Sequence, residues 1–94
     1  MSLLAVKLEC DSDNPPTGSA AQMDVNKNGT TIFSTNPTLD AGESDSNDAT
    51  TPSVLTANPT ELDVGDILDF DLDQIGSTNA GQGYKCTLIV VRAN

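Results

Sequence analysis

The chain has 94 residues, with 14 acidic residues against 4 basic ones and a net charge of −10 at pH 7. The length fits one domain over residues 1–94, because either half alone would be too small to bury a useful core. The acidic charge repels phosphate backbones, so we expect no nucleic-acid partner. No apolar run approaches the roughly 20 residues of a membrane-spanning helix, so we expect no membrane partner.

The first third of the chain predicts strands joined by polar turns. No segment keeps a helical period over three turns, whereas β-branched residues and turn formers are frequent. Residues 3–10 form the first expected strand, and a polar loop with two prolines follows at 11–18. Residues 21–27 and 30–35 flank Asn28-Gly29, which favours a hairpin because both central residues of a type I′ turn need positive φ.

Two segments in the middle of the chain have similar sequences. Asn36-Pro-Thr-Leu-Asp-Ala-Gly42, with a short strand expected at 38–40, aligns with Asn58-Pro-Thr-Glu-Leu-Asp-Val-Gly65 after a one-residue gap. We interpret them as two similar strand entries into turns, since a single pair falls short of a repeat array. Between them, residues 41–50 are polar and acidic, which predicts an exposed loop, and residues 53–57 resume the strand pattern.

The clearest alternation lies at Leu68-Asp-Phe-Asp-Leu-Asp73. It predicts a strand with Leu68, Phe70 and Leu72 in the core and the aspartates in water. After a glycine-rich turn, the last strand is expected over residues 84–92. Its Leu88-Ile-Val-Val91 run is apolar on both faces, as in a strand that is central in a sheet or covered by a neighbouring subunit.

Six or seven short strands without a helix to cover them predict an all-β fold, either a β-sandwich or a small barrel. If the first and last strands pair antiparallel, Cys10 and Cys86 lie near each other. We expect these two cysteines to be reduced or, if oxidised, bonded to each other.

One segment opens like a calcium-binding loop. Asp24, Asn26 and Asn28 alternate before Gly29, but the twelfth position, which needs Glu, is Thr35. We interpret the segment as a hairpin turn. The aspartates at 69, 71 and 73 span roughly 13 Å along a strand, too far for one ion to touch all three, so we expect no metal site.

The residues that would carry catalysis are scarce. The chain has no histidine to act as a general base, no Cys/His pair, and no Gly-rich loop that opens a helix for phosphate. We therefore expect no catalytic residues, no cofactor and no enzymatic activity.

Several short sequence motifs resemble those of a known family: Asp24-Val-Asn-Lys-Asn-Gly-Thr-Thr-Ile-Phe33, Leu39-Asp-Ala-Gly-Glu43, Val64-Gly-Asp66, Asp71-Leu-Asp-Gln-Ile-Gly-Ser77 and Ala80-Gly-Gln-Gly83. Over residues 20–91 the chain resembles a β-sandwich module of jelly-roll type from tailed-bacteriophage structural proteins. The resemblance implies a small antiparallel β-sandwich of about seven or eight strands. Such modules occur in fibres and appendages, and similar small jelly rolls are free-standing decoration, or cement, proteins on capsids.

Because the chain starts with Met and ends just after its last expected strand, we expect the free-standing role. The resemblance then implies a capsid decoration protein that binds the assembled head and stabilises it by bridging capsid subunits. Its partner would be the major capsid protein, and its location the outer capsid surface of the virion. No signal peptide is evident at the N-terminus, so we expect synthesis in the host cytoplasm.

We also expect a homotrimer, because the terminal strands carry more apolar surface than one face of a small sandwich readily buries. The expected interface residues are Leu3, Leu4, Val6, Leu88 and Val90. The alternative function is a carbohydrate-binding or host-recognition module of a phage fibre or appendage. Sugar sites usually need aromatic platforms, and the aromatic residues of this chain are Phe33, Phe70 and Tyr84.

Overall fold

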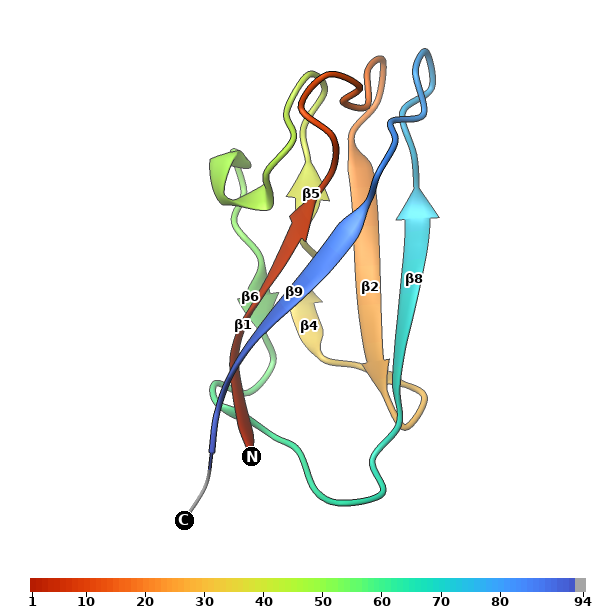
Figure 1. Ribbon diagram of the computed structural model, residues 1–94. Coiled ribbons are helices and arrows are strands. Elements are labelled where there is room, and N and C mark those ends of the chain that lie inside the picture. Colours follow the sequence, from red (N-terminus) through yellow and green to blue (C-terminus); the bar gives the residue numbers. More distant parts are fainter. Residues whose placement is uncertain (93–94) are drawn as a thin grey trace.

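The computed structural model describes residues 1–92 and shows an all-β fold of antiparallel sheets (Figure 1). In chain order the elements are β1 (Ser2–Glu9), β2 (Ala21–Lys27), β3 (Thr30–Thr31), β4 (Phe33–Thr35), β5 (Thr38–Leu39), the 3-10 turn η1 (Ser46–Asp48), β6 (Val54–Leu55), β7 (Thr60–Glu61), β8 (Leu68–Gln74) and β9 (Lys85–Val91). The predicted all-β class is therefore confirmed. The connectivity specific to a jelly roll stays a prediction.

Two main sheets form the two layers of the molecule. One has the order β7-β1-β9; in the other, β2 pairs with β8 over most of its length and with β3 and β5 at its two ends. A separate pair of strands, β4 and β6, contributes the buried Phe33 and the partly buried Leu55 to the core. The buried apolar side chains are Leu3, Val6, Leu8, Ala21, Met23, Val25, Ile32, Phe33 and Leu39. Because β1 and β2 each supply three of these nine, the core lies between these two strands.

The predicted hairpin is confirmed at its turn. Asn28 and Gly29 have φ values of 53° and 87°, and Lys27 pairs with Thr30 across them. The ladder stops after the next pair, and the chain bends at the buried Ile32 so that β4 pairs with β6 instead. The single strand expected over 30–35 is therefore two, and nine strands lie within residues 1–92 where seven or eight were expected.

The two segments of similar sequence, residues 36–42 and 58–65, form two similar turns. In each, the Asp carbonyl accepts a bond from the backbone N–H three residues later, at 2.8 Å for Glu43 and 3.1 Å for Asp66. The third residue of each turn is a glycine with positive φ, Gly42 at 86° and Gly65 at 94°, as a type II turn requires. The preceding strands enter different sheets, since β5 pairs with β2 and β7 pairs with β1.

The acidic loop over residues 41–50 is attached to β1 rather than fully exposed. Ser46 is buried, and its hydroxyl oxygen accepts a 2.9 Å bond from the backbone N–H of Leu8. Asp45 accepts a bond from the N–H of Asn47 and forms a 3.0 Å ion pair with Lys7. The prediction of an exposed loop is wrong at Ser46, because this side chain is buried where it accepts a hydrogen bond from β1.

The antiparallel pairing of the first and last strands is confirmed. Leu8 pairs with Cys86 in the β1–β9 ladder, and Cys10 follows two residues after Leu8. Such diagonal neighbours lie about 7–8 Å apart, slightly beyond the roughly 4.4–6.8 Å Cα separation that a disulfide usually spans. Both cysteines are half-buried and free.

Candidate interaction surface

β8 and β9 each lie at the edge of a sheet. Within residues 1–92, β8 pairs only with β2 and β9 pairs only with β1. Each strand is seven residues long and leaves one row of backbone N–H and C=O groups without a ladder partner. Long unpaired edges of this kind are templates for pairing with another chain.

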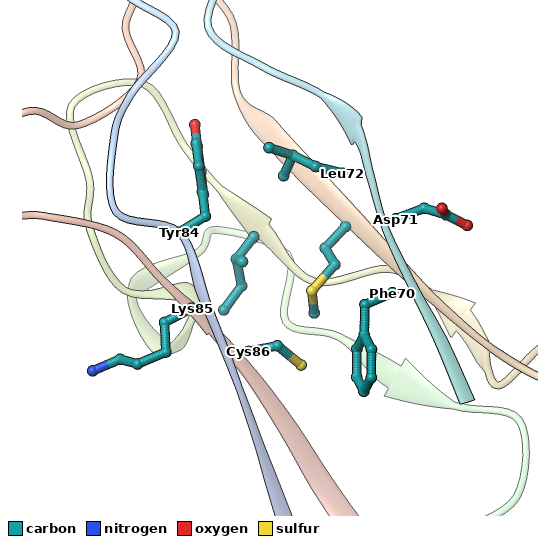
Figure 2. A pocket seen from close by; sticks show the side chains of 8 residues that line it. Phe70, Asp71, Leu72, Tyr84, Lys85 and Cys86 are labelled. Carbon is teal, nitrogen blue, oxygen red and sulfur yellow. The ribbon is translucent and has the colours of Figure 1, made fainter. Parts of the chain in front are cut away.

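A groove of about 240 Å³ lies between these two strands. Leu8 and Met23, from the core, line it together with Phe70, Leu72, Tyr84 and Cys86. Figure 2 shows the Phe70 and Leu72 side chains on β8 and that of Cys86 on β9 pointing into the groove. The two layers therefore stay apart on this side, and apolar side chains of both remain open to water.

The predicted alternation of β8 is present, but the prediction that all its apolar side chains are in the core is wrong. Leu68 is half-buried against the core, whereas Phe70 is 49% exposed and Leu72 is 40% exposed. They point inward, yet no strand beyond β8 covers them in the described part of the chain.

β9 also lies at an edge rather than in the middle of its sheet, which excludes one of the two readings of its apolar run. Ile89 is 50% exposed, and Val90 and Val91 are exposed as well. Cover by a neighbouring subunit, the other reading, stays a prediction.

The charges on the two edge strands have opposite signs. β8 carries three aspartates and no basic residue, and β9 carries Lys85 and no acidic residue. Asp71 lies directly across the ladder from Asp24, an arrangement of like charges that is unfavourable. Lys85 is 4.0 Å from Glu9, and about two thirds of its side chain is exposed.

Tyr84 stands at the upper end of the groove in Figure 2. Its hydroxyl donates a short hydrogen bond to the carbonyl of Ala80, which fixes the ring against the glycine-rich turn. Burial raises the pKa of Tyr84 and the pKa of the Cys86 thiol, so both groups are neutral at pH 7.

The structure separates the five residues predicted to form a subunit interface. Leu3 and Val6 lie in the core of the single chain and have almost no surface to offer a second copy. Leu4 and Val90 are exposed, and Leu88 is half-buried.

The calcium-like segment forms the β2–β3 turn. The Asp24 carboxylate accepts a 2.5 Å bond from the Thr31 hydroxyl. Asn28 donates a 2.9 Å bond to Asp66 and accepts a 3.0 Å bond from the N–H of Ile67, which fastens the hairpin to the Gly65 turn. In the part of the chain that the structure describes, no three His, Cys, Asp or Glu side chains are grouped to hold a metal ion.

The sequence placed Leu72 in the core and Cys86 near Cys10, but it did not indicate that either lines a groove, and it did not single out Lys85. The opposite charges of the two strands can be seen in the sequence, but their positions at open edges cannot, because sheet order depends on pairing between distant segments.

Across residues 1–92, no helix has the length and apolarity needed to cross a bilayer. In comparisons with known proteins, no family model, curated protein or solved structure matches the chain.

Proposed function

We propose that the chain is a bacteriophage capsid decoration protein that binds the assembled head and stabilises it by bridging capsid subunits. The phage role comes from the resemblance of residues 20–91 to jelly-roll modules of phage structural proteins. The observation that carries a binding role is the open side between β8 and β9, where the groove residues Phe70 and Leu72 remain 49% and 40% exposed. Uncovered apolar surface of this kind marks an interaction site.

The mechanism is binding linkage, without catalysis. A protein that binds the assembled shell but not the free subunits stabilises the shell by mass action, and many copies on a symmetric lattice add avidity. The proposed partners are the major capsid protein and further copies of this chain, with a homotrimer as the proposed assembly. The proposed location is the outer surface of the virion.

Electron microscopy of the parent particle tests this proposal. We expect density for the chain at symmetric positions on the outer shell, and heads that lack the chain to rupture at a lower temperature until purified protein is added back. Density confined to a tail or fibre, or heads equally stable with and without the chain, would contradict the proposal.

One observation favours the alternative, a carbohydrate-binding or host-recognition module. Two aromatic side chains, Phe70 and Tyr84, line one groove together with Asp71. In that case Tyr84→Ala abolishes binding on a glycan array while the far-UV circular dichroism spectrum stays unchanged. No binding by the wild-type chain to any glycan on the array would remove the alternative.

A further inference from the structure

We propose that copies of this chain join edge to edge, with β8 of one copy pairing antiparallel with β9 of the next copy. The apolar grooves then face one another at the centre of a closed ring, and Asp71 of one copy lies beside Lys85 of the next. The inference rests on the self-association proposed above, but not on binding to a capsid.

The directions of the two strands permit this pairing. Figure 1 shows β8 and β9 running in opposite directions on their separate sheets. Rotation about an axis along the length of the molecule preserves these opposite senses, so β8 of one copy meets β9 of the next in the antiparallel sense. Each strand then gains the second ladder that it lacks in the single chain.

The side chains alternate in a way that suits a joined sheet. Figure 2 shows Phe70 and Leu72 pointing into the groove, while Asp71 and Lys85 point away from it on opposite sides of the molecule. Both residues nevertheless border the groove, so each lies beside the open edge that the proposed contact uses. In the ring they meet on the outer face of the joined sheet, and the apolar side chains lie on its inner face.

Charge selects this pairing over pairing of like edges. Two β8 strands paired antiparallel would place aspartates beside aspartates, and like charges opposite each other are destabilising. Asp71 already faces Asp24, and no lysine or arginine among residues 1–92 forms an ion pair with either. Lys85 is largely exposed and meets Glu9 at the limit of an ion pair, so its ammonium group is free to approach a carboxylate of the next copy.

The resulting contact is heterologous, because two different edges meet, and such contacts form rings when the rotation closes. Closure also removes both unpaired edges, as in a barrel. The single chain thus carries both halves of the contact on its open side.

Charge reversal tests the contact in purified full-length protein, with no capsid present. Sedimentation equilibrium gives the dissociation constant of the wild type, Asp71→Lys, Lys85→Asp and the double variant at one ionic strength. We expect the wild type to associate at micromolar concentration and each single reversal to weaken association by about tenfold or more. The double variant should recover to within about threefold of the wild type, because opposite charges again face each other.

Asp48→Lys is the matched control, since it makes the same charge change on the exposed end of η1. It should leave the dissociation constant within about threefold of the wild type. Circular dichroism confirms folding of each variant. If a reversal unfolds the chain, Asp71→Asn and Lys85→Gln replace it in the same cycle, and a loss shared by both singles and not deepened in the double supports the contact.

A wild-type chain that stays monomeric in this range would overturn the contact and leave the capsid-binding proposal standing. Association that is insensitive to Asp71→Lys would also overturn it, because Asp71 would then lie outside the contact. Failure of the chain to bind heads, with the rescue intact, would contradict the proposed function and not this contact.

Discussion

β2 and β8 are neighbours in one sheet and have the same alternating pattern, yet they differ in burial. Met23 on β2 is 4% exposed, and Leu72, its direct partner on β8, is 40% exposed. Both side chains face the same layer. The difference is that β2 has strands on both sides and β1 packed against it, whereas β8 has β2 on one side and water on the other.

Alternation therefore reports which face of a strand is apolar, but not whether another element covers that face. On β2 the apolar face forms the core. On β8 it forms one wall of a groove, and the proposed second copy would complete the burial that the single chain leaves unfinished.

The largest effect is expected on the covered strand. Met23→Ala should lower the free energy of unfolding by about 2–5 kcal/mol, because it removes buried methylene groups and leaves a cavity. Urea denaturation at a concentration below self-association measures the loss. Each buried methylene group contributes about 0.8 kcal/mol. A cost below about 1 kcal/mol would therefore correspond to little more than one such group and would show that Met23 is not enclosed.

Leu72→Ala on the edge strand should cost less, about 1–2 kcal/mol in the same dilute protein, because a fully buried leucine contributes about 1.5–3 kcal/mol and this one is partly exposed. The cost should grow at concentrations where copies associate, since the next copy then covers Leu72. Equal losses for the Met23 and Leu72 variants in dilute protein would show that the open side is closed within one chain.

Much of the local structure could be predicted from residue chemistry. Asn28-Gly29 supplies two residues that tolerate positive φ, and Gly42 and Gly65 supply the third position of two similar turns. Each of these features depends on a few consecutive residues. The inward face of each strand follows from a similarly short-range alternation of apolar and polar residues.

The sheet order and the open side could not be predicted in this way. That Phe70 is half exposed depends on β8 being at an edge, and this follows from which distant segment pairs with which. The attachment of η1 likewise depends on Ser46 reaching Leu8, a contact that spans 38 residues. Sequence reasoning placed the interface on the terminal strands, but two of its residues, Leu3 and Val6, complete the core.

The smallest predicted effect concerns the η1 loop, which is held against β1 by Ser46 and Asp45. The N–H of Asn47 and the Lys7 ammonium lower the pKa of Asp45, and Asp45 raises the pKa of Lys7. A lowered carboxyl pKa stabilises the fold above the unfolded value and loses this contribution as pH falls through the folded value. A raised lysine pKa stabilises below its unfolded value and loses this contribution as pH rises through the folded value.

Asp45→Asn, which keeps an oxygen to accept the Asn47 N–H, should therefore be slightly less stable than the wild type at neutral pH. The difference should shrink below about pH 4 and above about pH 10.5, where one partner of the pair loses its charge. Thermal unfolding of both proteins across pH measures it, with Asp48→Asn as the control of equal charge. A difference that is constant from pH 3, about one unit below the ordinary aspartate pKa, to pH 11, about half a unit above the ordinary lysine pKa, would contradict the role of the ion pair.

Hydrogen exchange at two protein concentrations tests the contrast between covered and open strands most directly. Amides on the outer edges of β8 and β9 should exchange quickly in dilute protein and become protected as the concentration rises, while amides of β2 stay protected at both concentrations. Exchange of the β8 and β9 edges that does not change with concentration would contradict the account, because those edges would then have no second copy to pair with.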